Sequence, residues 1–135
     1  MSLPRFMIAA PASGSGKTLV TCGLLQALVD RGLKVASFKC GPDYIDPMFH
    51  SRAIGTRSKN LDAYFVEEPV LRYLFGRTAE TVDISVVEGV MGFYDGVTFD
   101  GTFASSNDVS NKLGIPVVLL VNAKGASLST VAVLK

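Results

Sequence analysis

The feature that most constrains the fold is a glycine-rich loop, Pro11-Ala12-Ser13-Gly14-Ser15-Gly16-Lys17-Thr18, between two elements of different periodicity. The short apolar run at 6–10 is bounded by prolines and predicts a buried strand. Residues 17–31 carry apolar side chains at helical spacing and stop at Gly32, which is typical of a helix end. A strand, this loop and a helix in that order are typical of a phosphate-binding loop.

The chemistry of the loop favours an anion. Glycines let successive backbone N–H groups face one point, and the helix start adds partial positive charge. Lys17 is then placed to bridge the β- and γ-phosphates of a nucleotide, and the Thr18 hydroxyl to ligate Mg²⁺. The nucleotide-binding candidates are Ser13, Gly14, Ser15, Gly16, Lys17 and Thr18. Pro11 replaces the first glycine of the usual pattern, which leaves this physical argument intact.

Strand and helix patterns alternate along the rest of the chain. Strands are predicted at 34–40, 83–88 and 116–121, the last as a central strand covered on both faces, and helices at 68–76 and near 105–113. Residues 41–60 are predicted as a loop with one helical turn, and 127–135 as the start of a helix. The alternation predicts a doubly wound α/β domain with a mainly parallel sheet, whose ligands bind at the carboxyl ends of the strands.

Composition excludes several classes of protein. The 13 basic and 12 acidic residues nearly balance, so neither nucleic acid nor an anionic membrane is expected as a partner. The apolar stretches are shorter than the roughly 18 residues of a membrane helix. Two cysteines, Cys22 and Cys40, make no disulfide framework, and buried thiols of this kind are typical of a cytoplasmic protein.

A second loop, Lys39-Cys40-Gly41-Pro42-Asp43-Tyr44-Ile45-Asp46-Pro47, leaves the same edge of the predicted sheet. Lys39 is a candidate second cation for the γ-phosphate. Asp43 and Asp46 have a spacing that suits a metal, and capping of the turn is the alternative for both. His50 is the only histidine, for which a structural role is favoured over a catalytic one.

A third loop follows the strand at 83–88 and begins with Glu88. P-loop enzymes place the acid that holds Mg²⁺ at such a strand end. Asp95 lies in the same loop, before Gly96, where a turn role is the alternative.

Together the three loops closely resemble the amino-terminal domain of the cobyrinic acid and hydrogenobyrinic acid a,c-diamide synthase family, in the P-loop superfamily of dethiobiotin synthetase. The segments that carry the resemblance are Gly14-Ser15-Gly16-Lys17-Thr18, Gly41-Pro42-Asp43-Tyr44-Ile45-Asp46-Pro47 and Glu88-Gly89-Val90-Met91-Gly92-Phe93-Tyr94-Asp95-Gly96. It runs from residue 6 to the end of the chain and includes Asn60-Leu61-Asp62. It departs at Cys40, where proline is usual, and at Asn122, where aspartate is common.

The resemblance implies an ATP- and glutamine-dependent amidation of the a- and c-carboxylates of a corrin precursor, cobyrinate or hydrogenobyrinate, through acyl phosphates in cobalamin biosynthesis. ATP is the implied co-substrate, and Mg²⁺ is implied on Thr18, Asp43 and Glu88. Catalytic roles are implied for Lys17, Lys39, Asp43 and Asp95, and substrate handling for Tyr44, Ile45, Asp46 and Asp95. The family also carries a carboxyl-terminal glutaminase domain that makes the ammonia, so residues 1–135 are expected to be one incomplete ATP-binding domain.

Three alternatives stay open at this point. Two are related enzymes, a dethiobiotin synthetase-like ligase and a nickel-sirohydrochlorin a,c-diamide synthase. The third is a P-loop regulatory ATPase that controls a partner, which Ala12 disfavours because ATPases that partition DNA carry a lysine there. The corrin precursor, its cobalt content, the selectivity for the nucleotide base and the oligomeric state, with a homodimer as one option, are not decided by the sequence.

Overall fold

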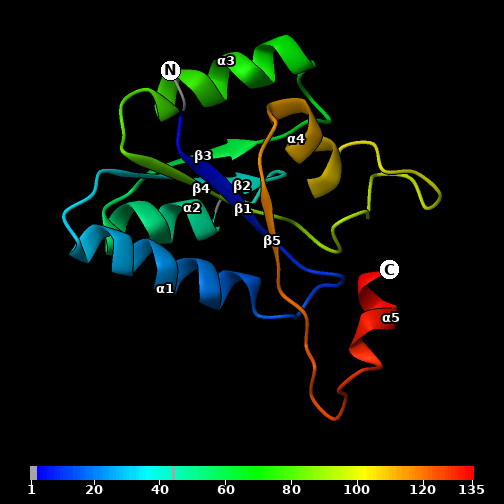
Figure 1. The fold of residues 1–135 in the computed structure, drawn as a ribbon. Helices are drawn as coiled ribbons and strands as arrows, with labels where there is room; N and C mark the ends of the chain where they lie inside the picture. The colour runs from blue at the N-terminus through cyan, green and yellow to red at the C-terminus, as the bar shows by residue number, and fades with distance from the viewer. Residues whose placement is uncertain (1–2, 44) are drawn as a thin grey trace.

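The computed structural model describes residues 3–43 and 45–135, and a parallel β-sheet runs through its centre (Figure 1). The sheet has five strands in the order β3-β2-β4-β1-β5, and every neighbouring pair is parallel. The strands are β1 (Arg5–Ala9), β2 (Val35–Cys40), β3 (Arg57–Leu61), β4 (Ile84–Glu88) and β5 (Val117–Leu119). The predicted doubly wound α/β fold is confirmed.

Helices cover both faces of this sheet (Figure 1). They are α1 (Lys17–Asp30), α2 (Ile45–Phe49), the π-helix η1 (His50–Ile54), α3 (Glu68–Ala79), α4 (Ser106–Leu113) and α5 (Thr130–Leu134). One core forms where α3 and α4 pack on the sheet, around Leu71 and Val109, and the other forms under α1 and η1, around Leu25 and Ile54. The predicted helices at 17–31, 68–76 and 105–113 are confirmed, the second with an extension to Ala79.

The alternation of side chains along each strand decides what faces the phosphate loop. Val86 belongs to the core under α1, whereas Val87 belongs to the core under α3 and α4. Since residues two apart on a strand share a face, Glu88 lies on the α1 side. Lys39 of β2 is paired in register with Glu88. Two buried charged side chains therefore lie at the carboxyl ends of adjacent strands, Glu88 as the last residue of β4 and Lys39 as the last but one of β2, beside the start of α1.

Residues 41–60 contain more regular structure than the loop with one helical turn that the sequence predicted. They form α2, the π-helix η1 and most of the edge strand β3. The predicted helical turn is present as α2, but the prediction missed β3, because this strand reads Arg57-Ser58-Lys59-Asn60-Leu61 and has hardly an apolar residue. The strand is held partly by hydroxyl groups, since Ser37 of β2 lies 2.7 Å from Ser58 and 3.0 Å from Thr56.

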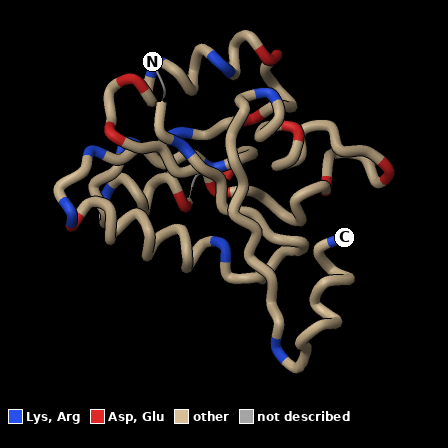
Figure 2. The backbone as a smooth tube through the Cα atoms, in the orientation of Figure 1, with Lys and Arg blue, Asp and Glu red and all other residues tan. Residues whose placement is uncertain are grey.

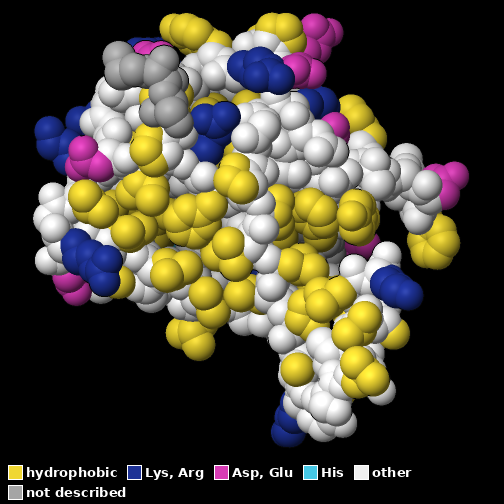
Figure 3. Space-filling model, in the orientation of Figure 1, with side chains coloured by type: hydrophobic (Ala, Val, Ile, Leu, Met, Phe, Trp, Pro, Cys, Tyr) yellow, Lys and Arg dark blue, Asp and Glu magenta, His cyan; other side chains and the backbone are white. Residues whose placement is uncertain are grey.

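The position of β5 is a second correction. The sequence predicted a central strand covered on both faces, but β5 is the last strand in the order and spans only three residues. Val118 is 49% exposed and Leu119 is 36% exposed. Figure 3 shows hydrophobic side chains open to the surface around β5 and α5. Within the described residues β5 therefore has one unpaired side and a partly exposed face, which differs from the predicted central strand.

Charges are dispersed over the described chain. Figure 2 shows basic and acidic residues interspersed, with no continuous basic face in this view. None of the helices in the described part of the chain has the length and apolar character needed to cross a membrane. Cys22 and Cys40 are both free thiols, as the sequence predicted.

Candidate functional site

A pocket of about 450 Å³ lies at the carboxyl edge of the sheet, where the loops after β1, β2 and β4 meet. It is lined by Ser13, Gly14, Gly16, Lys17, Thr18, Leu19, Lys39, Asp43, Glu88, Val90 and Met91. Most of the nucleotide and metal candidates predicted from the sequence are therefore brought together in one place. This edge is where ligands bind in open parallel sheets.

The loop before α1 has the backbone that an anion cradle requires. Gly14 and Gly16 have φ values of +72° and +87°, which side-chain-bearing residues rarely adopt. Gly16 is the N-cap residue of α1, so the first N–H groups of the helix receive no partner from a cap side chain. The Ser15 hydroxyl donates to the Ala12 carbonyl at 2.8 Å and tightens the turn.

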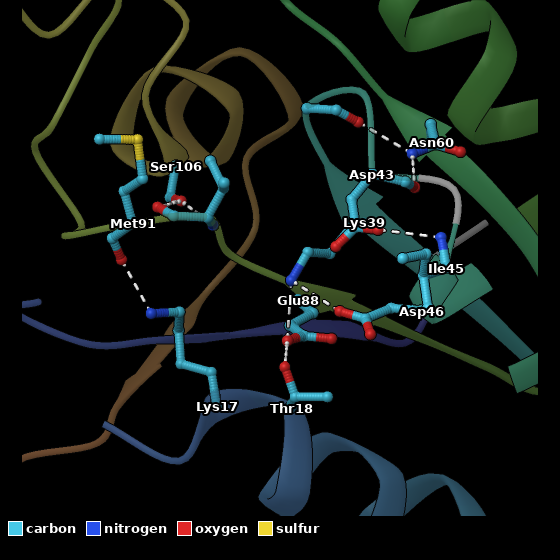
Figure 4. A network of polar contacts seen from close by, with 12 residues as sticks. Lys17, Thr18, Lys39, Asp43, Ile45, Asp46, Asn60, Glu88, Met91 and Ser106 are labelled. Carbon is cyan, nitrogen blue, oxygen red and sulfur yellow. Dashed lines mark hydrogen bonds and ion pairs between the residues drawn. The ribbon is translucent and has the colours of Figure 1, made fainter. Parts of the chain in front are cut away.

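The side chain of Lys17 lies across the mouth of this cradle. Its ammonium donates to the carbonyl of Met91 at 2.8 Å and to that of Ala12 at 3.3 Å (Figure 4). Burial and then the nearby charge of Lys39 lower the pKa of Lys17 below its ordinary value. An ammonium has three donors, so one remains to meet a phosphate oxygen.

Glu88 is the centre of the polar network in Figure 4. Its side chain is fully buried, and its Oε1 accepts from the Thr18 hydroxyl at 2.7 Å and from the Lys39 ammonium at 2.9 Å. Lys39 also forms an ion pair with Asp46 at 3.2 Å. Burial alone would lower the pKa of Lys39, but the hydrogen bonds and charges of Glu88 and Asp46 outweigh it and raise the pKa above its ordinary value. Lys39 is thus a fixed cation at the pocket.

The donor set at this point fits a magnesium ion. Mg²⁺ prefers oxygen ligands and is commonly bound by one or two carboxylates together with a phosphate. Glu88 Oε2 is buried and has no hydrogen-bond partner among the described residues. It lies beside the hydroxyl of Thr18, a second hard oxygen donor. Within residues 3–43 and 45–135, no three His, Cys, Asp or Glu side chains converge, so a carboxylate and a hydroxyl are the core of this candidate site.

The β2–α2 loop holds the other sequence candidates. Asp43 lines the pocket, but its Oδ1 accepts from the backbone N–H of Ile45 at 2.9 Å, which is the turn-capping role given as an alternative. Ile45 itself is 79% exposed on α2 beside the pocket. Tyr44, the remaining substrate candidate, lies outside the described residues. His50 is buried, and burial lowers the pKa of its imidazole, in keeping with the structural role favoured by the sequence.

Asp95 does not line the phosphate pocket. It lies in the loop between β4 and α4, where its Oδ2 accepts from the backbone N–H of Gly92 at 2.9 Å. This loop encloses a second hollow of about 680 Å³ that includes Tyr94 and Asp95. Met91 lines both hollows, so the two adjoin.

Two polar contributions were not predicted from the sequence. Asn60, at the end of β3, donates from its amide to the carbonyls of Gly41 at 2.9 Å and Asp43 at 2.6 Å (Figure 4). It therefore shapes the loop that carries Asp43. The backbone carbonyl of Met91 is the second contribution, and no side-chain pattern could have revealed it. The Asn60-Leu61-Asp62 segment was part of the resemblance but carried no assigned role.

Comparison with known proteins agrees with a nucleotide site at the carboxyl edge of the sheet. Residues 6–128 match the family model described as the CobQ/CobB/MinD/ParA nucleotide binding domain. The chain belongs to this family. Its matched region contains the three loops described above, and the family's nucleotide-binding character agrees with the pocket at the start of α1.

Curated relatives are similar over nearly the whole chain. Hydrogenobyrinate a,c-diamide synthase of Streptomyces coelicolor is 50% identical over 131 residues, which cover 97% of this chain and 27% of the relative. Cobyrinate a,c-diamide synthase of Streptococcus sanguinis is 45% identical over 96% of this chain and 29% of its own length. Hydrogenobyrinate a,c-diamide synthase of Rhodobacter capsulatus is 49% identical over 93% of this chain and 29% of its own length. The chain thus spans less than a third of these relatives.

Proposed function

We propose that this chain is the nucleotide-binding part of a ligase that uses ATP to amidate the a- and c-carboxylates of a corrin precursor. The observation that supports it most is the meeting of Lys17, Lys39, Thr18 and Glu88 in one pocket, in a chain 45 to 50% identical to the relatives named above. The same pocket would serve cobyrinate or hydrogenobyrinate, because the proposed contacts are with the phosphates of ATP and with the a- and c-carboxylates that both precursors carry.

The need for ATP follows from the chemistry of a carboxylate. A carboxylate is a poor electrophile, because its carbon already shares negative charge between two oxygens. In the proposed reaction a carboxylate oxygen attacks the γ-phosphorus, ADP leaves, and an acyl phosphate forms. Ammonia then attacks the acyl carbon, and phosphate leaves with one of the original carboxylate oxygens. Glutamine is the proposed source of the ammonia, through a glutaminase as in the diamide synthase family.

The protein's own share of this chemistry is positioning and charge neutralisation. The N–H groups before α1 and the free donor of Lys17 would hold the β- and γ-phosphates. Lys39, fixed between Glu88 and Asp46, would offset the negative charge that builds on the transferred phosphoryl group. Thr18 and Glu88, with Asp43, would hold Mg²⁺, which would screen the phosphate charges once bound.

The substrate side is assigned to the loops beyond the phosphates. Asp95, Asp46, Ile45 and Tyr44 are proposed to meet the carboxylate that becomes phosphorylated, as the family resemblance implies. The hollow that contains Asp95 adjoins the phosphate pocket through Met91, which supports a substrate carboxylate reaching the γ-phosphate from that side.

The first test is the substrate dependence of ADP production. With MgATP and ammonium salts, the full-length protein that carries this chain should form ADP only when cobyrinate or hydrogenobyrinate is added, and should form one ADP for each amide. Dethiobiotin precursors and nickel sirohydrochlorin are the matched substrate controls. ADP production without any of these substrates, or dependent on a partner protein, would favour the regulatory ATPase instead.

A further inference from the structure

A buried serine at the start of α4 forms two hydrogen bonds with the loop between the phosphate pocket and the hollow of Asp95. The hydroxyl of Ser106 accepts from the backbone N–H of Val90 at 2.8 Å and donates to the Val90 carbonyl at 3.1 Å (Figure 4). Ser106 is 0% exposed. One hydroxyl thus satisfies both backbone groups of a single loop residue, which fixes that residue's position and its orientation.

These two hydrogen bonds of Ser106 are separate from the capping of α4. The N-cap of the helix is Ser105, whose hydroxyl accepts from the backbone N–H of Asp108 at 3.1 Å. The hydroxyl of Ser106 is therefore not needed for the helix end and is directed to the loop. The approach is close, because a Cβ built on Gly89 would lie 2.8 Å from Ser106 Oγ. Such a contact requires glycine at position 89.

Met91, the residue after Val90, links the position of this loop to Lys17 in the phosphate pocket. Met91 has a φ of +49°, in the left-handed region that costs a side-chain-bearing residue free energy, and surrounding contacts must hold it there. This conformation presents the Met91 carbonyl to the ammonium of Lys17 at 2.8 Å. The next residue, Gly92, donates its N–H to Asp95. The three consecutive residues 90–92 therefore connect Ser106 to Lys17 and to Asp95.

We propose that Ser106 is a positioning residue that acts through the backbone of Val90 and Met91 to hold Lys17 in place for the nucleotide. The proposal rests on the phosphate-binding role of Lys17 given above. It does not depend on which carboxylate substrate the ligase takes, so nucleotide affinity can test it alone.

The experiment compares Ser106→Ala with Ser110→Ala in the full-length protein that carries this chain. Ser110 is a matched control, because it is a buried serine of the same helix whose hydroxyl donates to the backbone carbonyl of Asn107. Calorimetric titration gives the affinity for MgATP. Ser106→Ala should weaken it about 10-fold, the effect of one to two lost hydrogen bonds, and Ser110→Ala should leave it within about twofold. An unchanged affinity in Ser106→Ala overturns the proposal.

A second readout asks whether the effect passes through Lys17. Brief treatment of the nucleotide-free protein with an amine-acylating reagent, followed by peptide mass spectrometry, gives the labelling rate of each lysine. Ser106→Ala should change the rate at Lys17 by about threefold, since its bond to Met91 loosens, and should leave exposed Lys34 and Lys59 unchanged. A loss of affinity with an unchanged rate at Lys17 also overturns the proposal, because Ser106 would then act by another route. This readout needs no substrate, so it stands even if the proposed amidation fails.

Discussion

Replacing Lys17 by alanine is expected to lower ATP turnover about 100- to 1,000-fold, the effect of removing one preorganised group that stabilises a charged transition state. Lys17 donates to two backbone carbonyls at the pocket and keeps one donor for phosphate. Its removal takes a positive charge from the place where the β- and γ-phosphates are proposed to lie. Steady-state ADP production with saturating substrate measures the effect.

Lys34→Ala is the matched control for Lys17→Ala. Lys34 is an exposed lysine that precedes β2, at the opposite end of the sheet from the phosphate pocket. Its removal should leave turnover within about twofold, because exposed charges far from a site are screened by solvent. Equal losses in the two variants would show that total charge matters and that Lys17 has no local role. Lys17→Arg should also lower ATP turnover, since a planar guanidinium cannot make the same hydrogen bonds to Ala12 and Met91 as a compact ammonium.

Replacing Glu88 has the second large expected effect, on both stability and activity. Glu88 accepts from Thr18 and Lys39 and is fully buried. Glu88→Ala would leave the Lys39 ammonium without its closest counter-charge, and breaking a buried pair in this way costs about 3–5 kcal/mol. Urea unfolding of the full-length protein measures that loss. Asp46 still pairs with Lys39, so the lower end of this range is expected.

Glu88→Gln separates the metal role from the structural one. Glutamine keeps the size and one acceptor oxygen but removes the negative charge that would attract Mg²⁺. Turnover should fall about 100-fold, and the Mg²⁺ concentration for half-maximal activity should rise. The control is Glu80→Gln, an exposed residue after α3, which should change neither quantity. A Glu88→Gln enzyme with normal Mg²⁺ dependence would remove Glu88 from the proposed metal site.

Much of the candidate site could be predicted because the residue types of its loops indicate the backbone geometry that the loops adopt. The glycines of the phosphate loop need left-handed backbone angles, and the structure has them at Gly14 and Gly16. A carboxylate and a lysine at the ends of predicted parallel strands had to lie at one edge, and Lys39 and Glu88 are in register on adjacent strands. The prediction that three loops share this edge is therefore confirmed.

The failures have equally specific causes. The strand β3 carries mostly polar residues and contacts β2 partly through the hydroxyls of Ser37 and Ser58, so it lacked an apolar signature. The apolar run of β5 does not show that it is the last strand among the described residues, because such runs occur at any position of a sheet. The contacts of Ser106 and the Met91 carbonyl depend on which backbone groups meet in space. Neither spacing nor composition carries that information.

In the proposed reaction this pocket transfers phosphate from ATP to a carboxylate before an amide forms. The direct measurement uses a corrin precursor labelled with ¹⁸O in its a- and c-carboxylates, the full-length protein that carries this chain, MgATP and ammonium salts. The inorganic phosphate released with each amide should contain one ¹⁸O atom, because phosphate leaves with a carboxylate oxygen. Unlabelled phosphate would rule out an acyl phosphate intermediate, since water and not the carboxylate would then have received the phosphoryl group.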